Sequence, residues 1–414
     1  MPVNILQQVV TYNESNLALL LNSFCFLSTA NKKFQKFNDD VPKNLGDTVS
    51  FDKPPRFSTN NGLVVTFQSA EQRVQNLVCD QSANVAYEFT AQQFIFNVRD
   101  YMSTFGKSAV AQLGTQVESN VAQLAETNTY RFYGDGVTPI NSYLQLANAL
   151  AFFRNYGAAP EDTKGYLSDL TFPGIVNSGL NQFTLEKNNR EMMSWEVGRF
   201  SNCEWYQSNL LKTHSAGSEG NAGSTLTVVS TTLDANGAVT AITFSGASAA
   251  SDANSVKKYD KFQFNDGVSG LTNLRYLTFI GQKPSQNPVQ FAATADAAST
   301  AGSQVTVSIN PPLQVNGGNN QNINTPIVAG MQVSVLPDHR CGLIYSGKAL
   351  FLAMPRLPDE DPYKTAVAMD PDSGASIRQY YGSLFGQNQR GMVHDVLWGS
   401  TLVDEYAMMV ALPV

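Results

Sequence analysis

The sequence predicts an α+β fold that carries a small inserted all-β domain, and three observations lead to this prediction. Between residues 98 and 131, apolar residues recur every three or four positions, which is the pattern of one long amphipathic helix. The stretch 213–255 contains no Lys or Arg and is dominated by Gly, Ser, Thr and Ala. Several short strand-like runs follow it, and mixed helix and strand patterns lie on both sides. A β-domain that interrupts such a pattern is best explained as an insertion.

Length and composition favour a large folded protein of two or three parts. The 414 residues are 43% hydrophobic and only 15% charged, below the roughly 25% charged residues of an average soluble chain. The net charge of −7 argues against a protein whose main task is to bind phosphate. Low charge on a protein this large suggests that partners cover much of its surface.

The cysteines and the lack of long apolar stretches indicate the cellular compartment in which the chain folds. Cysteines at 25, 79, 203 and 341 form no CxxC pair, so free and mostly buried thiols are expected. The N-terminus has no basic leader, and the apolar run Leu17–Leu21 is too short for a signal peptide. No apolar stretch approaches the roughly 20 residues that cross a bilayer. We expect a soluble chain, made and folded in a reducing cytoplasm, with no contact to a membrane.

The first hundred residues predict an arm followed by an open hairpin. In the arm, Lys32, Lys33 and Lys36 precede two aspartates, which favours a solvated helix end over a basic nucleic-acid arm. Strands are expected at 49–51 and 64–67, joined by a turn that contains Pro54-Pro55. Two prolines remove two backbone donors, so the hairpin is expected to be open at its tip. It is either a flexible loop or an arm that a neighbouring subunit covers.

The predicted helix is the clearest local element. Its length over 98–131 would be roughly 50 Å. Its apolar face is Met102, Phe105, Ala109, Leu113, Val117, Val121 and Leu124.

The remaining segments predict further mixed elements around the β-domain. A helix is expected within 138–157, with Gly157 as its C-terminal stop, followed by a strand and turn within 163–183. A late strand is expected within 196–211, and strands within 392–399 and 405–414 close the chain.

Inside the β-domain, the strongest signal is a hairpin over 224–246, because β-branched runs flank the turn Asp234–Gly237. Further strands are expected within 259–268, 274–281, 288–295 and 303–313. Several brief strands with turn residues between them describe a small all-β domain.

The sequence offers no catalytic constellation, and we expect neither an enzyme nor a cofactor. His214, His339 and His394 lie in no zinc motif, and His339 with Cys341 is a weak metal pair because no other donors lie nearby. No nucleophile elbow or phosphate-binding loop is present. The glycine-rich stretch Gly217–Gly223 is interpreted as a flexible linker.

Four segments, taken in order, carry a resemblance to a known family. They are KKYDKFQFNDG at 257–267, QVTVSINPPL at 304–313, the stretch 322–358 with its Asn-x-Asn-Thr start and basic turn, and VLWGSTLVDEYAMMVALP at 396–413. With the element order, they resemble the major capsid proteins of tailed bacteriophages, which have the HK97 fold. More narrowly, the chain resembles the P22 coat protein family, whose members carry an inserted β-barrel at this position.

The resemblance implies a division of the chain into an N-terminal arm (1–45), an extended loop with peripheral strands (46–97), a spine helix (98–133), a first axial segment (134–212), the inserted domain (213–322) and returning axial and peripheral strands (323–414). It implies that Asp52, Lys53 and Arg56 contact a neighbouring subunit and that Lys32, Lys33 and Lys36 lie in an arm that meets scaffolding protein. In the family, a charged hairpin of the barrel bridges capsomers. Here the hairpin 233–239 carries Asp234 and Asn236, so a contact through shape or backbone is expected in its place.

The expected function is therefore self-assembly into the icosahedral shell around the double-stranded DNA of a tailed phage. The implied partners are further copies in pentamers and hexamers, scaffolding protein, portal protein and weakly bound DNA. The implied location is the virion, assembled in the cytoplasm of a bacterial host. Two alternatives stay open: a cellular nanocompartment shell of the same fold and, from another class, a β-rich carbohydrate-active protein.

Overall fold

A computed structural model of the chain describes residues 26, 29–31, 48–53, 55–57, 67, 73–157, 162–179, 198–265, 274–315, 318–359, 363–369, 375–383 and 389–414. The described part is a strand-rich α+β protein. It divides into two compact units. The first contains residues 74–122 and 350–402 together with the described segments up to Phe51, and the second contains residues 52–73, 123–349 and 403–414.

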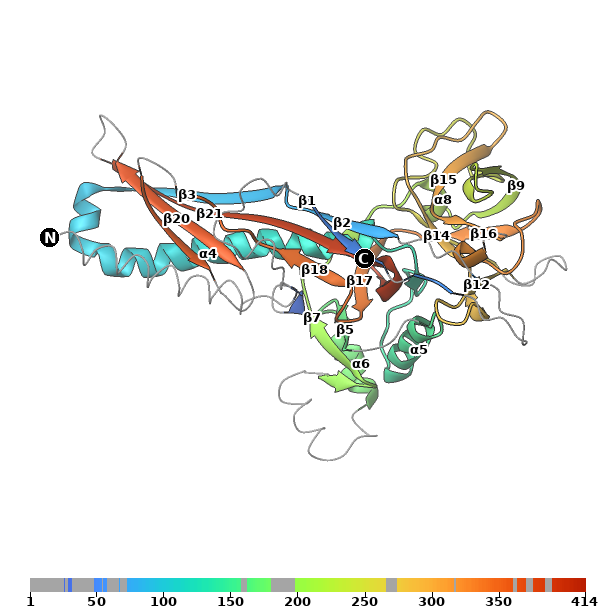
Figure 1. Cartoon of the computed structure of the whole chain (residues 1–414), viewed down its shortest axis with the longest axis horizontal. Helices are drawn as coiled ribbons and strands as arrows, with labels where there is room; N and C mark the ends of the chain where they lie inside the picture. Colours follow the sequence, from blue (N-terminus) through green and yellow to red (C-terminus); the bar gives the residue numbers. More distant parts are fainter. Residues whose placement is uncertain are drawn as a thin grey trace. The chain divides into compact units, whose positions relative to one another are not determined.

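The first unit is built on a five-stranded antiparallel sheet with β21 at its centre. Strand β21 (Gln389–Leu402) pairs along its length with β3 (Gln81–Thr90) and also with β20 and β18. The remaining strands of the sheet are β18 (Leu350–Ala353), β19 (Lys364–Met369) and β20 (Ser376–Ser383). Figure 1 shows these strands with the long helix α4.

Helix α4 (Ala91–Thr127) confirms the predicted long helix, with both ends displaced toward the N-terminus. At 37 residues it is roughly 56 Å long. The periodic face is buried at Ala109, Leu113, Val117 and Val121, whereas Phe105 is half exposed and does not belong to it. The helix ends at Thr127 rather than near residue 131 because the chain then turns into β4 (Phe132–Tyr133).

The predicted hairpin pairs differently from the expectation. Its first strand is present as β1 (Thr48–Asp52), but the partner is β2 (Val74–Val78). Val49 and Phe51 pack with Leu77 and Cys79, which are buried. The interval 64–66 lies outside the described residues, and Phe67 is described but is not in a strand. Most of the strand expected at 64–67 therefore lies outside the described residues, and among the described strands β1 pairs with β2.

The second unit contains a sheet around β17 (His339–Tyr345), which we call the axial sheet. Strand β22 (Ala407–Leu412) and strand β5 (Thr163–Leu167) pair with it on either side, and all six residues of β22 are buried. The other strands of this sheet are β4, β6 (Arg199–Phe200), β7 (Cys203–Gln207) and β8 (Thr213–His214).

Two helices accompany the axial sheet. Helix α5 (Tyr143–Arg154) confirms the helix expected within 138–157: the Ser142 side chain caps its start and Gly157 adopts φ +81 just after its end. Helix α6 (Phe172–Gly179) replaces the turn expected after β5, because Phe172 and Ile175, three residues apart, are buried on one face. No helix among the described residues is long and apolar enough to cross a membrane.

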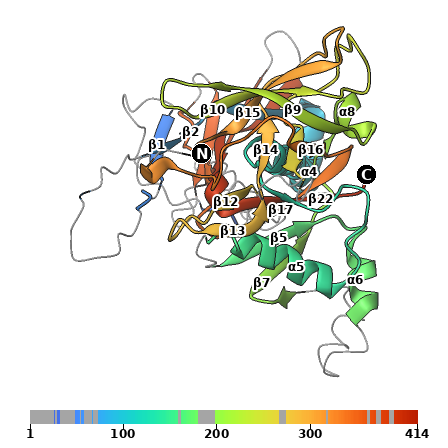
Figure 2. The ribbon, with the colours of Figure 1, turned by 90° about the vertical axis from the view of Figure 1, so that its right-hand side faces the viewer.

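Six described strands of the second unit close into a barrel in the order β10-β15-β14-β11-β16-β9 (Figure 2). Alternation of side chains fills it: in β15, Val305, Val307 and Ile309 point inward between exposed polar residues. Three parallel rings, Phe244, Phe262 and Phe291, stack in the core with centroids 5.0 to 6.4 Å apart. The barrel strands are β9 (Thr225–Leu233), β10 (Val239–Ser245), β11 (Lys261–Phe264), β14 (Gln290–Ala293), β15 (Gln304–Leu313) and β16 (Gln332–Val335).

The barrel lies between two strands that pair with each other. His214 of β8 is opposite His339 of β17, so the chain leaves and re-enters the axial sheet at neighbouring positions. Strand β16 pairs with β9 and β11, although it lies beyond residue 322, where the sequence places the end of the inserted domain. A two-stranded sheet, β12 (Arg275–Leu277) with β13 (Pro284–Pro288), and a one-turn 3₁₀ helix (Gly318–Asn320) complete this part.

The interpretation of Gly217–Gly223 as a flexible linker is wrong. It contains the short helix α8 (Ser218–Asn221), whose Glu219 side chain is fully buried and accepts from the backbone N–H of Ser248 and the hydroxyl of Ser255. A Cβ atom at Gly217 would lie 2.4 Å from the Ser255 carbonyl oxygen. Glycine is required here by close packing, not by flexibility.

Candidate functional site

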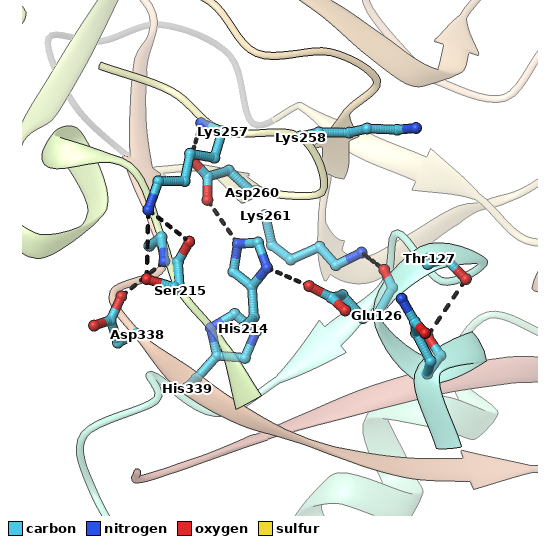
Figure 3. Close-up of polar contacts among 12 residues, drawn as sticks. Glu126, Thr127, His214, Ser215, Lys257, Lys258, Asp260, Lys261, Asp338 and His339 are labelled. Atoms are coloured by element: carbon cyan, nitrogen blue, oxygen red, sulfur yellow. Dashed lines mark hydrogen bonds and ion pairs between the residues drawn. The ribbon is translucent and has the colours of Figure 1, made fainter. Parts of the chain in front are cut away.

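Four buried charged side chains meet where the barrel joins the end of α4 and the axial sheet. We call Glu126, His214, Asp260 and Lys261 the junction cluster (Figure 3). Glu126 lies in the last turn of α4, His214 in β8, and Asp260 and Lys261 at the start of barrel strand β11. The cluster therefore connects three elements that are distant in sequence.

His214 lies between the two carboxylates. Its Nδ1 is 2.7 Å from Glu126 Oε1 and its Nε2 is 2.8 Å from Asp260 Oδ1. An ionised carboxylate only accepts hydrogen bonds, so with both acids ionised each ring nitrogen carries a proton, which is the imidazolium form. Burial lowers the pKa of His214, but the hydrogen bonds and charges of Asp260 and Glu126 outweigh it and raise the pKa above 6.5.

Lys261 closes the C-terminal end of α4. Its ammonium donates to the backbone oxygen of Glu126 at 2.8 Å and also to that of Thr129. A cation is favourable here because the last carbonyls of a helix have no partner within the helix and carry partial negative charge. Burial is the largest influence on Lys261 and lowers its pKa to about 8, although Glu126 and Asp260 favour the charged form.

A tight turn holds Asp260 in place. Its carboxylate accepts from the backbone N–H groups of Lys257 (2.8 Å) and Gly217 (3.2 Å). The preceding residue, Tyr259, adopts φ +73, a conformation that bulky residues rarely occupy. The segment 257–267, which carries part of the family resemblance, thus supplies two of the four members of the cluster.

His339 lies beside the cluster as a neutral ring, 5.2 Å from His214 between centroids. Its Nδ1 donates to the Pro337 carbonyl oxygen at 2.7 Å, and burial lowers its pKa to about 4. Cys341 of the same strand is buried, which raises its pKa to about 12. Among the residues that the structure describes, no group of three His, Cys, Asp or Glu side chains could hold a metal ion.

A second ionic group fixes the two residues that flank the interval 54–72, within the segment 46–97 predicted as the extended loop with peripheral strands. We call Lys53, Arg73, Asp404 and Glu405 the loop base. Lys53 Nζ lies 2.6 Å from Asp404 Oδ1 and 3.1 Å from Glu405 Oε2, and an Arg73 nitrogen lies 2.9 Å from Glu405 Oε1. Residues 53 and 73 flank the interval 54–72, so both ends are attached to the short 3₁₀ turn Asp404–Tyr406.

The two acids of this turn are electrostatically unequal. Burial, with the hydrogen bond and charge of Glu405, raises the pKa of Asp404 to about 7 despite Lys53. Burial also acts against ionised Glu405, but the hydrogen bond from Asp404 and the charges of Lys53 and Arg73 lower its pKa to about 2. Glu405 is the permanent anion of the loop base, and Asp404 gains or loses its proton near neutral pH.

The other predicted contact residues fall in distinct environments. Asp52 is exposed, whereas Arg56 is half buried: its guanidinium lies 5.2 Å from the Phe279 ring centroid and donates to the Tyr156 hydroxyl at 3.3 Å. Lys53 and Arg56 are thus partnered within the chain. Lys32, Lys33 and Lys36 lie outside the described residues.

The predicted barrel hairpin is held by its own aspartate. Asp234 Oδ1 accepts from the backbone N–H groups of Asn236 (2.9 Å) and Ala238 (2.7 Å), and Gly237 completes the turn at φ +76. Asn236 is exposed, and its backbone oxygen accepts from the Gln314 side chain. Asp234 has a structural role in the turn itself.

The junction cluster and the acids of the loop base were not predicted as sites. Asp260 and Lys261 lie in the segment 257–267 that carries part of the family resemblance, and His214 lies in no zinc motif. Their meeting depends on pairings across 46 and 88 residues, which no local pattern contains. An informative signal was the position of Glu126, a carboxylate in the last turn of a helix, where the dipole disfavours it.

The chain matches no protein-family model and no curated protein. It is similar to chains of solved structures at low sequence identity. For Mycobacterium phage Che8 the TM-score is 0.47 at 8% identity, over 94% of this chain and 90% of that chain. For the capsid of Ralstonia phage GP4 it is 0.44 at 8% identity, over 93% and 87%, and for the capsid of Cyanophage P-SCSP1u 0.41 at 11%, over 88% and 83%.

Proposed function

We propose that the chain is a major capsid protein of the HK97 fold, in the P22 coat protein family, that self-assembles into the icosahedral shell around the double-stranded DNA of a tailed phage. The observation that carries the proposal is the barrel inserted between the paired strands β8 and β17, in a chain that also has a 37-residue helix and a two-ended loop base. This arrangement agrees with the resemblance carried by the segments 257–267 and 304–313.

Exposed aromatic side chains near the ends of the loop support a contact with neighbouring subunits. Phe67 is 95% exposed and Phe57 is 56% exposed. Burial of one such side chain contributes about 2–3 kcal/mol. Contacts of this size are weak singly, but ring closure strengthens them because each later contact forms at high effective concentration. Pentamers and hexamers of one chain can be built in this way.

The net charge is consistent with the proposed contact to DNA, and scaffolding and portal protein are the other proposed partners. A net charge of −7 disfavours tight binding of DNA, which is consistent with weak, non-specific contact inside a filled shell. Under this proposal the arm that contains Lys32, Lys33 and Lys36 meets scaffolding protein, portal protein completes the shell, and the virion, assembled in the bacterial cytoplasm, is the final location.

Electron microscopy of the full-length chain tests the proposal, first alone and then with a candidate scaffolding protein. We expect closed shells, or tubes and spirals built from rings. A uniform monomer in both samples at high concentration would overturn assembly as the function. Shells that enclose protein cargo and exclude DNA in the native host would retain assembly but overturn the phage assignment in favour of a cellular compartment.

A further inference from the structure

We propose that His214 is a pH-dependent latch that holds the inserted barrel to α4 and the axial sheet while its ring is doubly protonated. The inference goes beyond the assembly function and does not depend on it. It rests on the geometry of the junction cluster, in which one imidazole bridges two carboxylates on different elements (Figure 3).

The charges around His214 balance only in the imidazolium form. Glu126 faces it from α4, and Asp260 and Lys261 face it from the barrel. Protonated His214 and Lys261 offset the two carboxylates, whereas a neutral ring leaves one buried negative charge in excess. Such an uncompensated buried charge is strongly destabilising.

Other titratable groups near the ring do not replace this charge. On β17, His339 is held neutral by burial, and buried Cys341 stays a thiol because its pKa is raised to about 12. In the turn before β17, Asp338 accepts from the backbone N–H of Ala216, and on the barrel side Lys257 donates to the backbone oxygen of Ser215. Neither Asp338 nor Lys257 makes a hydrogen bond to the His214 ring that the described structure records.

When the His214 ring loses a proton, its hydrogen bond to Asp260 on the barrel is lost before its hydrogen bond to Glu126. Asp260 already accepts two backbone N–H groups, whereas among the described residues His214 is the hydrogen-bond donor to the Glu126 carboxylate. The less satisfied carboxylate holds the remaining ring proton more strongly, so the neutral ring keeps Nδ1–H toward Glu126. The Nε2 lone pair then faces Asp260 Oδ1, and two acceptors repel each other at the barrel.

The direction of the pH effect follows from linkage. A histidine with a raised pKa in the closed form stabilises that form fully below its ordinary pKa of about 6.5, and this contribution is lost as the pH rises through the raised value. Between these two values, the closed population falls by up to tenfold per pH unit relative to the open one. Lys261 has the opposite slope above its pKa of about 8, so the pH range 6.5–8 separates the effect of His214 from that of Lys261.

The test uses ring-labelled histidine in the full-length chain, kept unassembled at low concentration, and follows imidazole resonances by NMR together with amide hydrogen exchange. We expect His214 to lose its second ring proton at a pH above 6.5, the ordinary midpoint of a histidine. Protection of the Gly217 and Lys257 amides, corrected for intrinsic rates, should fall several-fold from pH 6.5 to 8.

The variant Glu126→Gln is the decisive comparison. An amide can donate to Nδ1, so the neutral ring is satisfied on both sides. The protonation midpoint should move to a lower pH, at a proton concentration at least tenfold higher than in the wild type, and amide protection should become independent of pH. Glu219→Gln is the matched control, because Glu219 is equally buried but its recorded partners are serine groups; it should lower stability and leave the pH profile unchanged.

A wild-type His214 whose protonation midpoint lies at or below pH 6.5 would overturn the latch. A Glu126→Gln variant whose pH profile of amide protection is identical to that of the wild type would also overturn the latch. Neither result depends on whether the chain forms shells, so failure of the latch and failure of the assembly function are distinguishable.

Discussion

The Lys261 ammonium donates to the backbone oxygen of Glu126 at 2.8 Å, so a fully buried lysine of the barrel terminates the long helix α4. This contact joins the inserted domain to the helix at the point where the helix has unpaired carbonyl groups. It also explains why the charge of Lys261 remains in the protein interior despite the cost of removing it from water.

Replacement of Lys261 by Met should lower the free energy of unfolding by about 3 kcal/mol, because two backbone oxygens at the helix end lose a charged donor. Lys258→Met, at an exposed position three residues earlier, should change it by less than about 0.5 kcal/mol. Urea denaturation followed by circular dichroism measures both. Equal effects of the two substitutions would show that Lys261 does not cap α4.

The two acids of the loop base should respond unequally to loss of charge. At pH 8, Glu405→Gln should destabilise the protein by about 3 kcal/mol, because Lys53 and Arg73 lose their permanent buried anion. Asp404→Asn should cost less than about 1 kcal/mol, because it removes an anion that burial disfavours and keeps an acceptor for Lys53. Thermal unfolding of the two variants at pH 8 measures both effects. A larger loss of stability for Asp404→Asn than for Glu405→Gln would contradict the assignment of Glu405 as the permanent anion.

The raised pKa of Asp404 also predicts a pH dependence. The contribution of protonated Asp404 is complete below its ordinary pKa of 3.8 and is lost as the pH rises through about 7. The stability of the wild type should therefore decline between pH 5 and 8 relative to that of Asp404→Asn. The free energy of unfolding is measured by urea titration at each pH. If it depends on pH in the same way for both proteins over this range, the raised pKa of Asp404 is ruled out.

The barrel hairpin should depend on the acceptor oxygen of Asp234 and not on its charge. Asp234→Ala removes the acceptor of two backbone N–H groups and should cost about 1 kcal/mol. Asp234→Asn keeps an acceptor oxygen and should be close to the wild type in stability and in assembly followed by light scattering. A loss of assembly in Asp234→Asn, without loss of stability, would instead show an electrostatic bridge between capsomers.

Phe67 should act between subunits. Phe67→Ser removes a large exposed apolar side chain, so assembly should weaken while the unfolding of the isolated subunit changes by less than about 0.5 kcal/mol. Phe67→Leu keeps apolar area and should assemble nearly as well as the wild type. Sedimentation velocity separates subunits from assemblies, and normal assembly of Phe67→Ser would remove Phe67 from the contact.

Local patterns predicted the elements whose signals lie within a few residues. The periodic face at Ala109, Leu113 and Val117 gave the long helix, and β-branched runs around Asp234–Gly237 gave the β9–β10 hairpin. Helix α6 was missed because eight residues with Pro and Gly carry little helical signal. The pairing of β1 with β2 was not predicted because alternation identifies a strand but not the strand beside it.

The sequence by itself determined the α+β class, the long helix and the interruption by a β-rich segment, because each of these depends on periodicity or composition along the chain. Only the tertiary structure decided that β16 closes the barrel and that Glu126, His214 and Asp260 share one buried site. A buried charge is stabilised by partners that folding brings to it from distant positions. The charge state of His214 is therefore a property of the folded junction and not of its neighbours in sequence.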